Sequence, residues 1–232
     1  VYKRQRISSA TISSLSQDFE ESAFHFNKPF LDKEILWSGV IDGVAVKLLY
    51  NKFPFATLHG LLVPEPDQKI PQILGVDMHS FISALIKQLG NNIPGIAIAY
   101  NGYGAGASIN HLHFQTFTVN QPLPVLKQHW QHNGGSKAYP VTCKIFDDST
   151  NAWHYINELH RSNITYNLLY LPDKIVCLPR AFQGSYEIPD WTENFAWYEL
   201  CGGIITFNQN DFLKLADEKI TGALSALHLP IN

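Results

Sequence analysis

Residues 101–115 read Asn-Gly-Tyr-Gly-Ala-Gly-Ala-Ser-Ile-Asn-His-Leu-His-Phe-Gln. The end of this stretch and the residues after it, Leu112 to Val119, are rich in the apolar and β-branched residues of a strand. Side chains two apart in a strand share a face. We therefore expect one polar row facing a cleft and one largely apolar row facing the core: His111, His113 and Gln115 in the first, Leu112, Phe114 and Thr116 in the second.

The first part of the stretch combines three glycines with small residues, Gly102, Gly104, Gly106, Ala105, Ala107 and Ser108. Such a loop lets several backbone N–H groups surround an anion. A neutral imidazole is a competent nucleophile toward phosphorus at neutral pH, and it forms a phosphoramidate that remains reactive. An anion loop beside a histidine pair therefore points to phosphoryl chemistry.

The His-x-His pair has two other interpretations, which its spacing leaves open. Paired histidines on a strand also bind metal ions, and they also pack as ordinary core residues. In the cupin pattern a glutamate follows such a pair after three or four residues, but here Phe114-Gln-Thr-Phe-Thr118 follows. Nucleophile, metal ligand and structural residue all remain possible on spacing alone.

Outward from this stretch the chain alternates short strands with helices, which predicts an α+β fold. Residues 40–50 contain a turn-like Asp42-Gly43 and predict a hairpin. Apolar residues three and four apart predict a helix over 77–89 and a longer one over 211–227. Further strands are expected at 60–64, 96–100, 166–171, 174–180 and 203–207.

A Pro- and Gly-rich stretch over residues 121–140 separates two halves with partly similar element order. We expect an N-terminal segment of residues 1–23, a catalytic half of residues 24–120, and a degenerate copy over residues 121–232 packed as one unit with the first. The aromatic cluster of the second half is expected to be core or interface: Trp191, Phe195, Trp197 and Tyr198.

Composition narrows the classes of function. The 232 residues are 45% hydrophobic with a formal net charge of −3, and no run of Lys and Arg occurs, so nucleic acid is an unexpected partner. No apolar run approaches the roughly 20 residues that cross a bilayer, so no membrane partner is expected. The three cysteines form no C-x-x-C pair, which favours a reducing, cytoplasmic location.

Ser108-Ile-Asn-His-Leu-His-Phe-Gln115 resembles the S-x-x-H-x-H-x-Q signature of the galactose-1-phosphate uridylyltransferase branch of the histidine-triad (HIT) superfamily. The same eight residues are similar to those of GDP-galactose phosphorylases. The loop 101–108 resembles that of diadenosine tetraphosphate phosphorylases (ATP adenylyltransferases), as do Tyr50-Asn-Lys-Phe-Pro54 and Leu61-Leu-Val-Pro64. The likeness covers residues 24–227, and it is strongest at 50–66 and 101–117.

This resemblance implies a HIT-like antiparallel sheet flanked by helices, with a second degenerate HIT-like half. It also implies that His113 attacks the α-phosphorus of a nucleotide and holds the nucleotidyl group. Gln115 would stand where hydrolytic relatives have a third histidine and would donate its amide to a phosphate oxygen, which favours transfer over hydrolysis. The expected phosphate and nucleotide contacts are Asn51, Lys52, Asn101, Gly104, Ala105, Gly106, Ala107 and Ser108.

The expected activity is that of a nucleotidyltransferase or phosphorylase acting on a nucleotide sugar or a dinucleoside polyphosphate. The nucleoside monophosphate would pass to inorganic phosphate or a sugar phosphate. The alternatives are a uridylyltransferase-like exchange of hexose phosphates, a metal-binding protein, and a nucleotide-binding protein without turnover. No cofactor is expected beyond a divalent cation that accompanies the nucleotide.

Two departures from the family pattern leave roles open. The superfamily has Gly-His before the Leu-x-x-Pro strand, whereas this chain has His59-Gly60, so the role of His59 is undecided. The uridylyltransferases bind zinc through a Cys-x-x-Cys pair and the histidine that matches His111. Because the pair is missing, we expect no zinc site, and we expect His111 to orient His113 or contact phosphate.

Overall fold

A computed structural model describes residues 11–229, and these build a single eight-stranded sheet in the order β1-β2-β3-β5-β4-β7-β8-β6. Every pair of neighbouring strands in it is antiparallel. The strands are β1 (Ile35–Ile41), β2 (Val44–Tyr50), β3 (Thr57–Pro64), β4 (Ile96–Asn101), β5 (Phe114–Thr118), β6 (Lys144–Phe146), β7 (Thr165–Tyr170) and β8 (Ile175–Arg180).

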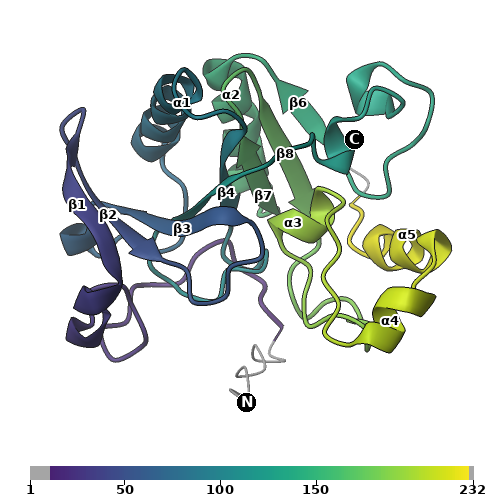
Figure 1. The fold of residues 1–232 in the computed structure, drawn as a ribbon, viewed down its shortest axis with the longest axis horizontal. Coiled ribbons are helices and arrows are strands. Elements are labelled where there is room, and N and C mark those ends of the chain that lie inside the picture. Colours follow the sequence, from purple (N-terminus) through teal and green to yellow (C-terminus); the bar gives the residue numbers. More distant parts are fainter. Residues whose placement is uncertain (1–10, 230–232) are drawn as a thin grey trace.

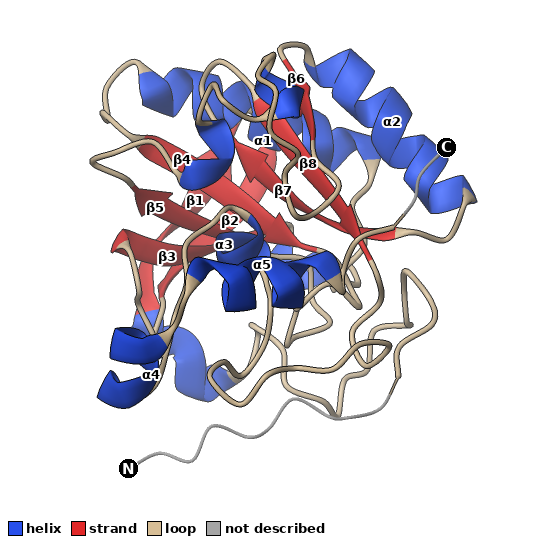
Figure 2. Cartoon of the chain, turned by 90° about the vertical axis from the view of Figure 1, so that its right-hand side faces the viewer, coloured by secondary structure: helices blue, strands red, loops and turns tan. Residues whose placement is uncertain are grey.

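Helices cover both faces of this sheet (Figure 1). The α-helices are α1 (Val76–Gly90), α2 (Ser149–Arg161), α3 (Trp197–Leu200), α4 (Gln209–Lys214) and α5 (Asp217–Ser225), with short 3₁₀ turns η1 (Pro29–Glu34), η2 (Pro66–Gln68), η3 (Pro124–Leu126) and η4 (Gln131–Asn133). Helices α3, α4 and α5 lie on the near side in Figure 2. The α+β class and the antiparallel sheet with flanking helices are therefore confirmed.

The two faces of the sheet carry different apolar clusters because consecutive strand residues alternate in direction. Ile98 and Tyr100 of β4 pack in the cluster that includes α1 and α2. Ala97 and Ala99 of the same strand pack in the cluster that includes α3 and α5. All six residues of β4 are buried, as expected for a central strand covered on both sides.

The hairpin predicted at Asp42-Gly43 is present between β1 and β2. Both turn residues have positive φ, 48° at Asp42 and 83° at Gly43. Two such residues match the twist of the flanking strands in a two-residue hairpin loop. The first strand is longer than the sequence indicated, because pairing extends back to Ile35.

The strands predicted near residues 60, 96, 166 and 174 and the helix over 77–89 are also confirmed, whereas three details differ. The strand expected from Leu112 begins at Phe114. Residues 203–207 form no strand, because Gly202 takes a φ of 89° and the amide of Gly203 bonds to the carbonyl of Tyr198, capping α3. The helix expected over 211–227 is two helices, since Leu215 and Ala216 are extended.

Both halves of the chain contribute to the one sheet. β4 pairs with β7, joining Ile98–Asn101 to Asn167–Tyr170. Of the N-terminal segment, residues 1–10 lie outside the described residues, and residues 11–19 run against the loops that follow β4 and β8. Within the described part of the chain, none of the helices has the length and apolarity that a membrane span requires.

Candidate active site

His113 lies immediately before β5, which runs between β3 and β4 near the middle of the sheet. Leu112 and Phe114 on either side of it are fully buried in the cluster under α1 and α2. This packing matches the expected alternation, although residues 111–113 precede the strand. It directs the His113 ring toward the opposite side, where it contacts the ring of Phe26 at a centroid distance of 5.0 Å.

The hydrogen bonds of the His113 ring define its tautomer. Nδ1 lies 2.8 Å from the carbonyl oxygen of His111 and 3.0 Å from Oε1 of Gln72. Both partners are acceptors, so Nδ1 carries the proton and Nε2 has the free lone pair. Nε2 makes no hydrogen bond among the described residues. Burial lowers the pKa of His113 to about 4 despite the bond to His111, so the ring is neutral at pH 7.

Gln72 ties this histidine to the glycine loop, and no local sequence pattern marked it. Its Oε1 accepts from the amide of His113 at 2.9 Å, and its Nε2 donates to the carbonyls of Asn101 at 2.8 Å and His113 at 3.2 Å. Its main-chain N–H donates to Oδ1 of Asn110. This fully buried amide therefore fixes both ends of the stretch that carries the motif.

The side chain of His111 is buried, and this residue contacts His113 through its backbone carbonyl. Its Nδ1 accepts from the amide of Phe26 at 3.1 Å, so its proton is on Nε2. Rings of Phe19 and Phe26 surround it. Burial, and then the neighbouring His113, lower the pKa of His111 to about 4. Its carbonyl, rather than its ring, contacts and orients His113.

Gln115 is held by two residues from distant parts of the chain. Its Oε1 accepts from Nε1 of Trp197 at 2.8 Å and lies 3.0 Å from Nε2 of His59. Asn51 lies 3.0 Å from the same nitrogen of His59 through its Nδ2. The structure thus brings Asn51 and Gln115 together through His59, the residue whose role the sequence left undecided.

The loop 101–108 turns its carbonyls inward. The carbonyl of Gly104 accepts from the amide of Gln183 at 2.7 Å, and that of Ala105 accepts from Nδ2 of Asn167 at 2.7 Å. Gly104 and Gly106 have φ values of 75° and 91°. Among the described residues, no hydrogen bond uses the amides of Gly104, Gly106, Ala107 and Ser108. An anion is the natural partner for such a group of amides.

Two other predicted contacts have partners inside the protein. Asn101 is buried, and its Oδ1 accepts from Nδ2 of Asn167 at 2.7 Å and from the amide of Trp197 at 3.0 Å. Nζ of Lys52 forms an ion pair with Glu34 at 2.7 Å. In the described part of the chain, Lys52 has no hydrogen bond or ion pair with the loop 101–108.

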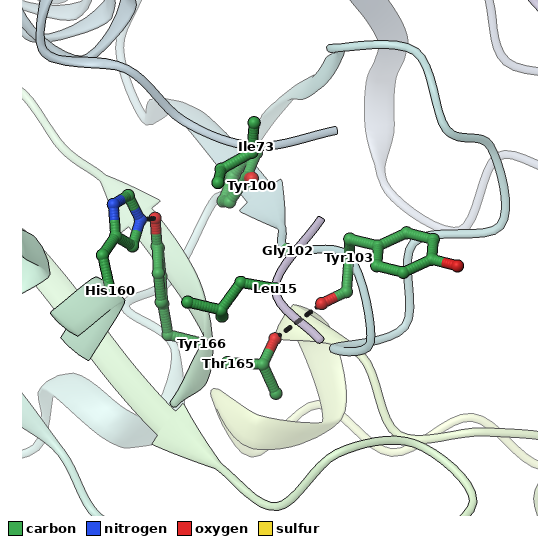
Figure 3. Close-up of a pocket in the computed structure, with 8 residues that line it drawn as sticks. All are labelled: Leu15, Ile73, Tyr100, Gly102, Tyr103, His160, Thr165 and Tyr166. Atoms are coloured by element: carbon green, nitrogen blue, oxygen red, sulfur yellow. Dashed lines mark hydrogen bonds between the residues drawn. The ribbon is translucent and has the colours of Figure 1, made fainter. Parts of the chain in front are cut away.

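Within the described residues, no group of three or more His, Cys, Asp or Glu side chains is arranged to hold a metal ion. A separate small hollow lies beside the loop 101–108. It is lined by Tyr100, Gly102, Tyr103 and Tyr166, with Leu15 of the N-terminal segment lying among them (Figure 3). It does not include His113 or Gln115.

Comparison with known proteins gives a family match and several relatives. Residues 2–117 match the family described as "GDPGP1-like, N-terminal domain". The human GDP-D-glucose phosphorylase 1 is 32% identical over 130 residues, which are 52% of this chain and 33% of that protein. GDP-L-galactose phosphorylase 2 of Arabidopsis thaliana is 27% identical over 206 residues, 77% of this chain and 47% of that protein. The chain thus spans less than half the length of these relatives.

Among solved structures, yeast Ap4A phosphorylase Apa2 in complex with AMP superposes with a TM-score of 0.63. The superposition covers 87% of this chain and 80% of that one at 21% sequence identity. At this level of identity the likeness establishes the fold alone. It is the fold of the HIT-like phosphorylases that the motif at residues 108–115 indicated.

Proposed function

The chain belongs to the GDPGP1-like family, and on that premise we propose that it is a nucleotidyltransferase that phosphorolyses a GDP-hexose. The overall reaction is GDP-hexose plus inorganic phosphate giving GDP and hexose 1-phosphate. The family match and the names of the relatives support the substrate class. The reaction proceeds in two displacements through a covalent intermediate on His113.

In the first displacement, Nε2 of His113 attacks the α-phosphorus of the GDP-hexose. A P–N bond forms, the bond between the α-phosphorus and the bridging oxygen breaks, and hexose 1-phosphate leaves with the electron pair of that bond. The proton on Nδ1 stays with the ring, because the carbonyl of His111 and Oε1 of Gln72 both accept it. These two acceptors also stabilise the positive charge that the imidazole gains.

In the second displacement, an oxygen of inorganic phosphate attacks the same phosphorus and the P–N bond breaks, which releases GDP and the neutral imidazole. The amide N–H groups of Gln115 bind α-phosphate oxygens in both steps. The amides of Gly104, Gly106, Ala107 and Ser108 hold the departing and the incoming phosphate. Asn51 lies at the nucleotide side of the site, and a divalent cation enters only bound to the nucleotide.

The tautomer of His113 carries this proposal. A histidine placed for packing alone has no need of two acceptors on Nδ1 and none on Nε2, whereas a nucleophile requires that arrangement.

The test is to incubate the protein with GDP-glucose labelled at the α-phosphate, without inorganic phosphate, and to measure label on denatured protein. We expect label on the wild type and only background on His113→Asn, and added phosphate should discharge the label as GDP. A wild-type protein that never retains label contradicts the covalent route.

A second incubation, with inorganic phosphate present and a panel of substrates, decides between two candidate activities. The fold of Ap4A phosphorylase covers 87% of the chain, which makes diadenosine tetraphosphate the second substrate to try. Products with GDP-glucose, GDP-galactose and diadenosine tetraphosphate would be identified by mass. A parallel incubation with a metal chelator shows whether turnover needs a divalent cation.

A further inference from the structure

Oε1 of Gln115 receives a pair of N–H donors from opposite halves of the chain. Nε1 of Trp197 lies 2.8 Å from this oxygen, and Nε2 of His59 lies 3.0 Å from it. An indole N–H only donates, so the atom of Gln115 that faces it must be the oxygen. A carbonyl oxygen has two lone pairs, and here both are used. The amide nitrogen therefore points elsewhere, and it makes no hydrogen bond among the described residues.

The His59 ring is held in the tautomer that this arrangement needs. The amide of Phe55 donates to its Nδ1 at 3.4 Å, so Nδ1 is an acceptor and the proton lies on Nε2, facing Gln115. The nearby Nδ2 of Asn51 would need a lone pair on that same Nε2. Because the Phe55 amide requires the lone pair on Nδ1, we assign the Nε2 proton to the bond with Gln115.

Trp197 is positioned by packing that does not involve Gln115. It is fully buried and stacks on Phe117 of β5 at a centroid distance of 4.4 Å and an interplanar angle of 23°. Its main-chain amide donates to Oδ1 of Asn101. The indole N–H is thus fixed relative to the strand that carries Gln115 and to the start of the glycine loop.

We infer that Trp197 and His59 are positioning residues that lock the Gln115 amide with both its N–H groups toward the transferring phosphate. This inference rests on the proposed function. A free glutamine amide rotates between orientations that present oxygen or nitrogen to the phosphate, and only the second stabilises an anion. Donors fixed before the reaction stabilise developing charge without reorganisation, so the two residues act on the rate of transfer more than on binding.

A double-mutant cycle tests the inference with GDP-glucose and inorganic phosphate as substrates. Trp197→Phe keeps an aromatic ring against Phe117, and it removes the indole N–H together with part of the buried ring system. In the wild-type background we expect it to lower kcat about tenfold and to change KM by less than about threefold, because the lost interaction belongs to the transition state. In the Gln115→Ala background the same substitution should change kcat by less than about twofold.

The matched control is Trp191→Phe, which alters a half-buried tryptophan that contacts Phe195 and has no hydrogen bond to Gln115 among the described residues. It should leave kcat unchanged in both backgrounds. His59→Phe removes the other donor and should repeat the coupling with Gln115→Ala, which keeps the test decisive if Trp197→Phe folds poorly. Equal losses in the two backgrounds would overturn the inference while leaving the transfer reaction intact. A wild type that transfers nothing overturns the proposed function itself, and the inference with it.

Discussion

At the scale of single residues, the site depends on where each imidazole keeps its proton. His113 carries it on Nδ1, whereas His111 carries it on Nε2, because one ring faces acceptors and the other faces the amide of Phe26. Both rings are buried among apolar side chains, and burial disfavours the charged form. The motif therefore holds two neutral imidazoles, of which one has its lone pair available.

This arrangement predicts how stability depends on pH. The pKa of both His113 and His111 is lowered to about 4 in the folded protein, against about 6.5 in the unfolded chain. Between these values the unfolded chain binds protons that the folded protein does not. Above about pH 6.5 these two rings should therefore not change the free energy of unfolding. As the pH drops from 6.5 toward 4, the free energy of unfolding should fall by up to about 1.4 kcal/mol per pH unit for each ring.

Urea unfolding at pH 7, 6 and 5 and constant ionic strength measures this slope. His113→Gln removes one of the two rings and should make the slope shallower. Identical slopes for the wild type and this variant would show that folding does not lower the pKa of His113.

At the scale of elements, the loop 101–108 combines two features that an anion site needs. Its carbonyls at Gly104 and Ala105 accept hydrogen bonds from donors in the second half of the chain, so these two oxygens do not face a bound anion. Its amides at Gly106, Ala107 and Ser108 remain without a bond in the described part of the chain. The positive φ of Gly104 and Gly106 produces this separation of carbonyls from amides.

Gly106→Ala should destabilise the loop 101–108 in two ways, through backbone strain and through close contacts of the new Cβ. A Cβ there would lie 3.1 Å from the carbonyl oxygen of Phe195 and 3.1 Å from Cβ of Ala196, at a φ of 91°. Gly43→Ala is the matched control, since it has a φ of 83° with nothing within 4 Å. Gly43→Ala should cost about 1–2 kcal/mol in denaturant unfolding from strain alone, and Gly106→Ala should cost more because of these contacts. Only Gly106→Ala should slow labelling of His113. Equal labelling rates for the two variants would separate this loop from the reaction.

At the scale of the whole molecule, the second half supports the site of the first. Asn167 and Gln183 anchor the glycine loop, and the indole N–H of Trp197 donates to Gln115 of β5. The pairing of β4 with β7 makes the sheet continuous between the halves. The catalytic residues proposed here lie before residue 121, whereas much of what orients them lies after it.

A fragment of residues 1–120 should therefore fail to fold cooperatively. It would expose the edge of β4 and the side chains of Ala97, Ala99 and Phe117, which are fully buried in the complete sheet. Thermal melts followed by circular dichroism should show no sigmoidal transition, and amide NMR signals should be poorly dispersed. A cooperative melt with dispersed signals would mean that residues 24–120 form an independent domain.

The elements that could be predicted from sequence are those whose signal is local. The turn at Asp42-Gly43 needs only two residues that tolerate positive φ. The helix α1 needs only apolar residues at helical spacing. The prediction over 203–207 was wrong because strand-like residues form a strand only beside a partner strand, and here the amide of Gly203 bonds to α3 instead. The break between α4 and α5 likewise arises at Leu215 and Ala216, inside an unbroken apolar pattern.

The alternation around His113, the glycine loop before it and the family likeness of residues 108–115 could all be predicted from sequence, because neighbouring residues encode these features. The hydrogen bonds of Gln72 to His113, and those of Trp197 and His59 to Gln115, became visible only once the chain was folded. These contacts join residues 41, 82 and 56 positions apart. A hydrogen bond between such distant residues depends on how the whole sheet packs, and no stretch of sequence contains that information.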